Sequence, residues 1–249
     1  MNTQIDAIFL DVGNTLRIVV EDAAFQAEAR QQLHALVGAR DDIEAFFESL
    51  EAQWKKYRKT SFEQLREASE FELWTRYMLP DYPVEVIGPQ AGRLTRLWRD
   101  CDGRRVPRHD VRDTVRELIR RGYTLGIIAN TITETEIPDW LEADGLTDAF
   151  KAVVLSSKVA FRKPGPEIYF EACRRIGIPP QRCAYVGDNP IRDVEGTRLA
   201  GFGMAIVFLL DGKEVTVSDA QKADRYIRQC SDLLAIFPPR TSPPAEAEK

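Results

Sequence analysis

Hydrophobic and polar positions follow two different patterns along the chain. Between about Asp22 and Trp98, apolar residues recur at spacings of three and four, which predicts an all-helical segment. After Gly103, short apolar runs alternate with helical segments. Because strands separated by helices of this length pair in parallel, the second pattern predicts a parallel sheet covered on both faces. The chain is therefore predicted to be an α/β protein with a helical insert.

The sheet region is predicted to alternate strands with helices. Strands are expected at Ile5–Leu10, Tyr123–Ala129, Ala152–Leu155, Cys183–Val186, Met204–Phe208 and Tyr226–Ile227. Helices are expected at Val111–Arg121, Pro166–Ile176, Arg192–Ala200 and Ser231–Phe237. Pro166 near the start of its helix and Gly177 just past the end are typical of helix termini.

The helical insert contains several aromatic residues and a possible internal helix start. A further helix is predicted to begin at Ser61, whose side chain would pair with the backbone of Gln64 in a capping box. The stretch Met78–Pro83 ends this helix, and a last helix is expected around Leu94–Trp98. The aromatics are interpreted as core residues, with a substrate pocket as the alternative, because apolar residues at helical spacing usually form core.

Composition and charge exclude several classes of partner. Lys and Arg total 34 against 39 Asp and Glu, and the net charge of −5 lacks the basic footprint of nucleic-acid binding. The N-terminus has no signal-peptide pattern and no apolar run reaches membrane-spanning length, so a cytoplasmic protein without a membrane partner is expected. With two His and four scattered Cys, zinc-ligand spacing is absent.

Polar residues follow four of the predicted strands at the points where they end. Asp11 follows the first strand, Asn130 and Thr131 follow the second, and the segments Phe161–Pro164 and Gly187–Asp193 follow the next two. Ligands of an open parallel sheet bind beyond the carboxyl ends of its strands, so these residues are expected to share one crevice. Each residue type is also common in strand-ending turns. Together, however, carboxylates, a lysine and small polar groups favour a hard cation and a phosphoryl group.

The acidic residues of this set predict a magnesium site and a nucleophile. Magnesium commonly uses one or two carboxylates with water and substrate phosphate, and Asp11 and Asp188 would serve as those carboxylates. Asp193, in the first turn of the following helix, would orient a ligand water. Asp11 could also attack phosphorus to form an aspartyl-phosphate that water hydrolyses. Lys163 would then neutralise charge on Asp11 and on the phosphoryl oxygens.

Four ordered motifs resemble those of the haloacid dehalogenase-like hydrolases. They read Phe-Leu-Asp-Val-Gly-Asn-Thr-Leu, Leu-Gly-Ile-Ile-Ala-Asn, Arg-Lys-Pro-Gly-Pro-Glu-Ile-Tyr and Tyr-Val-Gly-Asp-Asn-Pro-Ile-Arg-Asp-Val-Glu-Gly. The resemblance implies a Rossmann-like three-layer core with a helical cap inserted after the first motif. It also implies Asp11 as nucleophile and metal ligand, a Gly13 carbonyl to the metal, Lys163 as the charge-stabilising lysine, and Asp188 and Asp193 as the acidic metal motif.

The resemblance and the patterns together divide the chain into three parts. The core is expected at residues 1–18 and 103–237, and the cap at residues 19–102. The tail, residues 238–249, is rich in Pro, Ala and Glu and has too little apolar surface to offset its ordering entropy, so it is predicted to be disordered.

Two positions depart from the phosphatase pattern of the family. Gly13 stands where such phosphatases carry a second Asp as general acid and base, a group typically worth about two to four powers of ten in rate. Ala129 stands where relatives have a Ser or Thr that binds the phosphoryl group. Thr131 could replace it if the strand stays extended, although Asn130 could already begin the turn. Arg17, after the first motif, is either a contact to an anionic substrate or an ordinary solvated arginine.

Three functions follow from these residues. The leading one is a magnesium-dependent phosphatase that acts on a small phosphorylated metabolite through Asp11. The alternative is a catalytically weak or inactive protein of the same fold that binds a ligand or regulates a partner, since two catalytic side chains are missing. Carbon–halogen hydrolysis, which uses the same aspartate without a metal, is the third, and the acidic motif argues against it.

Overall fold

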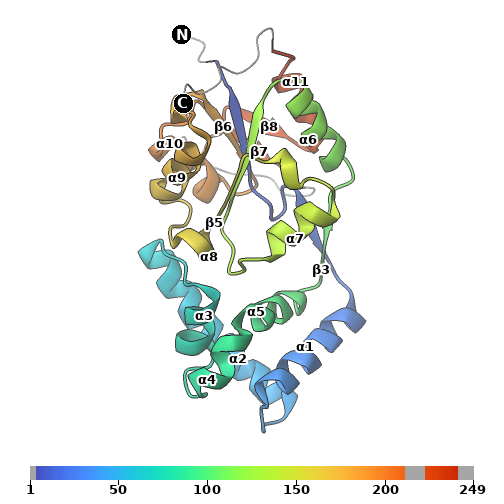
Figure 1. Ribbon diagram of the computed structural model, residues 1–249, viewed down its shortest axis with the longest axis vertical. Coiled ribbons are helices and arrows are strands. Elements are labelled where there is room, and N and C mark those ends of the chain that lie inside the picture. The colour runs from blue at the N-terminus through green and yellow to red at the C-terminus, as the bar shows by residue number, and fades with distance from the viewer. Residues whose placement is uncertain (1–3, 211–221, 241–249) are drawn as a thin grey trace.

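A computed structural model describes residues 4–210 and 222–240, and its centre is a six-stranded sheet in the order β5-β4-β1-β6-β7-β8 (Figure 1). Every neighbouring pair in this sheet is parallel, as predicted. The strands are β1 Ala7–Leu10, β4 Thr124–Ala129, β5 Ala152–Leu155, β6 Cys183–Gly187, β7 Met204–Phe208 and β8 Arg225–Ile227.

Helices cover both faces of the sheet and give the core its three layers. On one face lie α6 (Val111–Arg120), α7 (Glu136–Ala143) and α11 (Leu233–Ile236), and on the other lie α9 (Pro166–Ile176) and α10 (Gly196–Leu199) (Figure 1). Shorter helical segments are α8 Ser156–Val159, the 3₁₀ turns Thr147–Ala149, Pro180–Arg182 and Cys230–Asp232, and the π-helical turn Pro190–Glu195.

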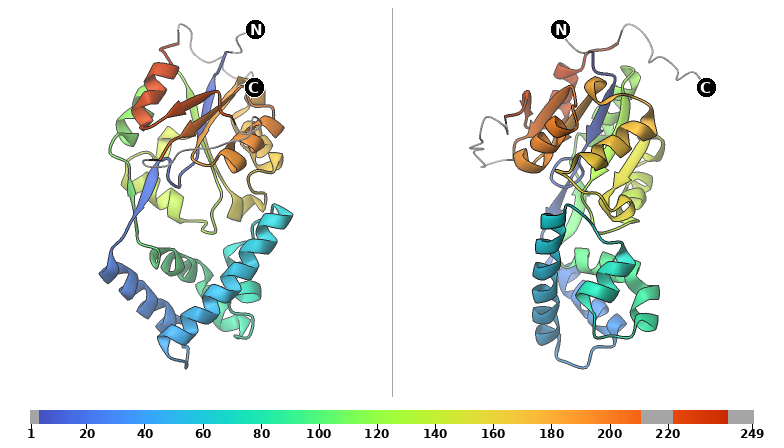
Figure 2. Two further views of the ribbon diagram at one scale, coloured as in Figure 1. Left: turned by 180° about the vertical axis from the view of Figure 1, so that it is seen from behind. Right: turned by 90° about the vertical axis from the view of Figure 1, so that its left-hand side faces the viewer.

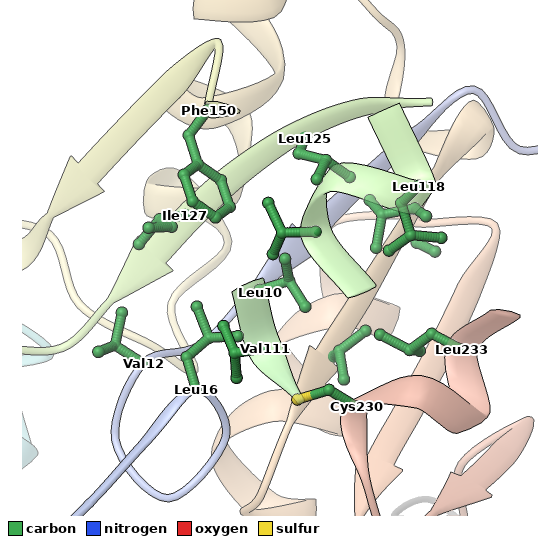
Figure 3. Packing of buried hydrophobic residues seen from close by; sticks show 14 of the residues in the cluster. Leu10, Val12, Leu16, Val111, Leu118, Leu125, Ile127, Phe150, Cys230 and Leu233 are labelled. Atoms are coloured by element: carbon green, nitrogen blue, oxygen red, sulfur yellow. The ribbon is translucent and has the colours of Figure 1, made fainter. Parts of the chain in front are cut away.

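Strand β1 is buried on both sides, because alternate residues of a strand point to opposite faces. Ile8 and Leu10 join the cluster that contains Val111, Leu118 and Leu125, whereas Ala7 and Phe9 join the cluster against α9. Figure 3 shows Leu10 packed among side chains from α6, β4 and α11. Asp11 therefore starts from a strand that is held rigidly in the centre of the core.

The insert from Ala23 to Asp100 is helical, as predicted, and lies beyond one end of the sheet (Figure 2). It consists of α1 Ala23–Val37, α2 Ile43–Gln64, α3 Glu70–Glu72, the π-helical turn Leu73–Met78, α4 Val84–Ile87, the 3₁₀ turn Gly88–Gln90 and α5 Ala91–Asp100. These helices have a hydrophobic core of their own, which includes Leu33, Leu50 and Trp74 and also receives Ile132 from the loop after β4. The insert is therefore a separate packing unit that touches the sheet domain at its edge, as a cap does.

Two strands of the connection to the cap were not predicted from the sequence. β2 (Arg17–Val20) and β3 (Arg104–Pro107) pair in antiparallel fashion and form the ribbon by which the chain leaves the core and returns. Val19 and Val20 are exposed, so the ribbon lacks the alternation of buried and exposed residues that identifies a strand.

The predicted helix start at Ser61 is wrong. Helix α2 runs through this position without a break from Ile43 to Gln64, and it is capped instead by Asp42, whose carboxylate accepts from the backbone N–H groups of Glu44 and Ala45. The Ser61 hydroxyl donates to the carbonyl of Arg66 at 2.6 Å, near the C-terminal end of the helix. Ser61, which predicted the start of a helix, therefore lies near the end of one, where its side chain makes a polar contact.

Residues 238–240 of the predicted tail belong to the described part of the chain and contact the core, while residues 241–249 lie outside it. The backbone N–H of Arg240 donates to the carbonyl of Arg121 at 3.0 Å, and its guanidinium forms an ion pair with buried Asp6 at 2.5 Å. Arg240 therefore anchors this part of the chain through its backbone and its side chain, which the composition of the tail did not indicate. Among the described residues, no helix has the length and apolar character needed to cross a membrane.

Candidate active site

Asp11 lies at the carboxyl end of β1, in the middle of the sheet. The strand order places β1 between β4 and β6, so Asp11 is flanked by the loops that follow those two strands. Its backbone N–H donates to Val186 of β6 at 2.8 Å, and its Oδ1 accepts from the N–H of Val12 at 2.8 Å. In an open parallel sheet, this crevice is the usual ligand site.

Three carboxylates meet at this point, as the sequence predicted. One oxygen each from Asp11, Asp188 and Asp193 lies within 4.8 Å of the others. Asp188 follows β6 directly, and Asp193 lies in the π-helical turn, where the N–H of Asn189 donates to its Oδ2 at 2.9 Å. A Cβ on Gly187 would lie 2.4 Å from Asp193 Oδ2, so the glycine of this motif makes room for the carboxylate.

Lys163 is fully buried beside these carboxylates. Its Nζ lies 3.1 Å from Asp11 Oδ2 and 2.9 Å from Asp193 Oδ1, and it also donates to the hydroxyl of Tyr185. Tyr185, which the sequence analysis did not single out, in turn donates to the carbonyl of Ile128 at 3.0 Å. The three ammonium protons of Lys163 thus have three acceptors. These contacts hold its positive charge beside Asp11.

Arg192 is a second cation in the cluster, and the sequence analysis missed it. Its guanidinium contacts all three carboxylates, at 3.2 Å from Asp11 Oδ2, 3.0 Å from Asp188 Oδ1 and 3.5 Å from Asp193 Oδ1. Burial lowers the pKa of Arg192, but the three carboxylates outweigh burial and raise it above its usual range. The sequence did contain a signal for this contact: Arg192 follows Asp188 by four residues and lies on a helical turn, a spacing at which side chains meet.

The pKa values of the two buried aspartates, Asp11 and Asp193, are shifted in opposite directions. Burial raises the pKa of Asp11 above its ordinary value, and the positive charge of Lys163 only partly opposes this effect. Burial acts in the same direction on Asp193, but Lys163 and Arg192 together lower its pKa below the ordinary value. Lys163 and Arg192 therefore favour the charged form of Asp193, whereas burial disfavours the charged form of Asp11.

The loop after Asp11 is anchored by its apolar residues. Val12 and Leu16 are buried in the core, whereas Gly13 and Asn14 between them are exposed. Asn14 donates to Asp188 Oδ2 at 2.9 Å and has a φ of 57°, a conformation that asparagine tolerates better than most residues. A Cβ on Gly13 would meet nothing within 4 Å, so the structure leaves room for a side chain at this position.

The three residues predicted to contact phosphate have different surroundings. The side-chain amide of Asn130 bonds to both backbone groups of Lys163. β4 ends at Ala129, so Thr131 does not continue the strand, and its hydroxyl accepts from the N–H of Thr133 at 3.2 Å. Arg17 forms an ion pair with Asp144. All three line a cavity of about 170 Å³ that also borders Gly13 and Ala129.

The fold and the site define an α/β enzyme that works at the carboxyl edge of a parallel sheet, with an acidic cluster and a buried lysine. The sequence profile of the haloacid dehalogenase-like hydrolases matches residues 5–201. The chain therefore belongs to this family of hydrolases, as its motifs predicted.

Individual relatives are similar to the chain over different lengths. Phosphoserine phosphatase of Thermus thermophilus is 28% identical over 221 residues, which cover 78% of this chain and 85% of the relative. Glyceraldehyde 3-phosphate phosphatase of Methanopyrus kandleri is 34% identical over 109 residues, covering 43% of this chain and 45% of the relative.

Solved structures share the whole fold at low identity. A 2-haloacid dehalogenase from Pseudomonas syringae has a TM-score of 0.69 at 21% identity. The superposed region covers 94% of this chain and 98% of the dehalogenase chain. A haloacid dehalogenase-type phosphatase from Thermococcus onnurineus has a TM-score of 0.64 at 21% identity. The superposed region covers 96% of this chain and 100% of the phosphatase chain. At this identity the similarity extends to the fold alone.

Proposed function

We propose that this hydrolase is a magnesium-dependent phosphatase that acts on a small phosphorylated metabolite, with Asp11 as its nucleophile. The observation that carries the proposal is the position of Asp11, whose Oδ2 lies 3.1 Å from Lys163 Nζ within the three-carboxylate cluster. The phosphatase names of the two relatives described above support the same reaction.

In the proposed reaction, a carboxylate oxygen of Asp11 forms a bond to phosphorus while the ester P–O bond breaks. Water then attacks phosphorus, releases inorganic phosphate and restores the carboxylate. Lys163 balances the charge of Asp11 and of the transferring oxygens. Asp193 Oδ1 lies 2.9 Å from Lys163 Nζ and keeps this lysine in place.

The donor set fits a magnesium ion, because oxygen atoms of three carboxylates lie within 4.8 Å of one another. Asp11, Asp188, Asp193 and the Gly13 carbonyl would hold it. When bound, the ion supplies positive charge beside the transferring oxygens. Arg192 contacts the same carboxylates, so it and the ion would share them.

The roles of the neighbouring loop residues follow from their bonds. Thr131 remains our candidate for a phosphoryl contact, because its hydroxyl accepts one hydrogen bond and retains its own proton to donate. Asn130 would act through Lys163, and Arg17, which is paired with Asp144, would lie at the border of the smaller cavity. We also propose residues 1–18 and 103–237 as the core and residues 19–102 as the cap.

A second candidate is a ligand-binding protein with little turnover. Gly13 has no proton for the leaving group, and Ala129 has no donor for the phosphoryl group. Both losses leave Lys163 and the carboxylates in place, so binding would persist while turnover is slow.

A panel of phosphomonoesters, assayed with and without Mg²⁺, tests the proposal. The wild type should release phosphate only with Mg²⁺, and Asp11→Asn should lose roughly three powers of ten in rate because the nucleophile is gone. Asp148→Asn, an exposed carboxylate outside the site, is the matched control and should behave as wild type. An unchanged rate in Asp11→Asn would refute the nucleophile.

Two other results would favour the alternatives. Stabilisation of the fold by phosphorylated ligands without hydrolysis would favour the binding protein. Halide release from a haloacid without Mg²⁺ would favour carbon–halogen hydrolysis.

A further inference from the structure

A larger cavity lies between the cap and the core. Its volume is about 380 Å³, within the range of small-molecule sites, and its lining includes Trp54, Arg58 and Trp98 from the cap and Asn130 and Thr131 from the core. Asn130 and Thr131 also line the smaller cavity beside Gly13, so the two spaces meet at these residues. The larger cavity is thus placed to hold the part of a substrate that does not react.

The aromatics of the cap have mixed roles. Trp54 and Trp98 line the cavity, with ring centroids 6.0 Å apart, and both are only half-buried. Trp74, by contrast, is fully buried in the core of the cap. The interpretation of these residues as core therefore holds for Trp74, whereas two other tryptophans border a cavity.

Cations outnumber carboxylates around the cavity. Its charged lining consists of Arg30, Lys55, Arg58, Arg99 and Arg162 on the positive side and Glu51, Glu67 and Asp102 on the negative side. Three of these cations have carboxylate partners, in the pairs Arg30–Glu44, Arg99–Glu136 and Arg162–Glu67. Within residues 4–210 and 222–240, neither Lys55 nor Arg58 has an ion pair with a carboxylate.

Arg58 is held in position by aromatic rings, without an ion pair to a carboxylate among the described residues. Its guanidinium lies over the ring of Trp54 at 5.4 Å and over the ring of Phe62 at 4.9 Å. Burial and the charge of Arg162 lower the pKa of Arg58, the carboxylate of Glu67 partly opposes them, and the charge of Arg192 lowers it further. Arg58 thus adds a positive charge at the cavity, without an ion pair of its own in the described part of the chain, and an anion is favoured there.

Helix α2 presents this positive charge to the larger cavity. Trp54, Lys55 and Arg58 are neighbours on its surface, because residues three and four apart share a helix face. Arg58 lines the cavity from the cap, whereas Asn130 and Thr131 line it from the core.

We infer that the substrate carries a second anionic group besides the phosphoryl group that is hydrolysed, and that Arg58 and Lys55 bind it. This inference rests on the proposed phosphatase function and specifies the substrate class. The ligand is an organic phosphate of metabolite size that bears either a carboxylate or a further phosphate. Arg58 and Lys55 are then the residues that determine specificity, while Asp11 and Lys163 act on the phosphoryl group.

Matched ligand pairs test the inference by binding, measured by titration calorimetry in the full-length Asp11→Asn background. 3-Phosphoglycerate is compared with glycerol 3-phosphate, which lacks only the carboxylate, and fructose 1,6-bisphosphate with fructose 6-phosphate. At least one doubly anionic ligand should bind roughly tenfold or more tightly than its partner. The pair that has this preference identifies the second group as carboxylate or phosphate.

Arg58→Met and Lys55→Met, added to this background, should remove the preference. Each should weaken binding of the doubly anionic ligand and leave its singly anionic partner unchanged. Lys59→Met on the same helix is the control, because Lys59 is exposed and does not line the cavity. The inference is overturned if no pair has a preference, or if Arg58→Met weakens both members equally.

This experiment separates the inference from the proposed function, because binding is measured without the nucleophile. A preference that depends on Arg58, in a protein whose wild type never hydrolyses the ligand, would support the binding site and refute the phosphatase. Equal turnover of both members of each pair, unchanged in Arg58→Met, would support the phosphatase and refute the site.

Discussion

The side chain of Asn130 and the backbone of Lys163 are joined by two hydrogen bonds. Asn130 Nδ2 donates to the Lys163 carbonyl and Oδ1 accepts from the Lys163 N–H, each at 2.9 Å. The loop after β4 thereby holds the peptide of the residue that balances Asp11. We therefore propose that Asn130 is a positioning residue, in addition to the phosphate contact that the sequence predicts.

Asn130→Ala is expected to cost about 1–3 kcal/mol in the free energy of unfolding, because both partner groups lose their bond. A displaced Lys163 should also lower kcat by up to roughly 100-fold with less effect on KM. Urea denaturation and steady-state kinetics measure the two effects, with Gln32→Ala on the exposed side of α1 as control. If stability falls and kcat does not, Asn130 only supports the fold.

Gly13→Asp is expected to raise phosphatase activity by up to about two to four powers of ten, because it restores a general acid and base. The structure has room for the new side chain, since a Cβ there meets nothing within 4 Å. Gly13→Asn is the control of equal size that cannot transfer a proton in this way. Equal gains in both variants, or none in Gly13→Asp, would contradict the role assigned to this position.

Arg192→Met is expected to tighten Mg²⁺ binding roughly tenfold or more, because it removes the cation that contacts all three carboxylates. Without Mg²⁺, the variant should melt at a lower temperature than the wild type, since the carboxylates then repel one another. Calorimetric titration with MgCl₂ and thermal melts measure both effects. Arg198→Met, which removes a cation outside the carboxylate cluster, should leave Mg²⁺ binding unchanged, and any loss of stability in it reflects its ion pair with Asp224. Unchanged or weaker Mg²⁺ binding in Arg192→Met would show that the two cations do not compete.

Glu67→Gln is expected to lower the free energy of unfolding by about 3 kcal/mol, because it leaves buried Arg162 without its counter-charge. Glu67 Oε2 lies 3.3 Å from Arg162 and 3.1 Å from Ser156 Oγ, so this carboxylate fastens the cap to the loop that carries Lys163. Glu63→Gln, an exposed change in α2, should cost less than about 0.5 kcal/mol. A loss below about 1 kcal/mol in Glu67→Gln, measured by urea denaturation, would mean that the backbone bonds alone hold the cap.

Local patterns predicted most of the sheet and its motifs. The strand Ala152–Leu155 and the helix Pro166–Ile176 have the predicted ends, because each is a regular apolar pattern with clear terminal residues. The ribbon of β2 and β3 was not predicted, since short, exposed strands carry little pattern. The helix start predicted at Ser61 is wrong because the partners of this side chain, Arg66 and Arg162, lie outside any local capping motif.

The sequence by itself determined that Asp11, Lys163, Asp188 and Asp193 would meet, because parallel strands end at the same edge of a sheet and these residues follow strand ends. Only the tertiary structure decided what surrounds them. Three contacts depend on how separate segments pack: Arg192 with the carboxylates, Asn130 with the Lys163 backbone, and Arg58 with the cavity between cap and core. Side-chain direction and the distance between cap and core are set by such packing, and no spacing along the chain encodes them.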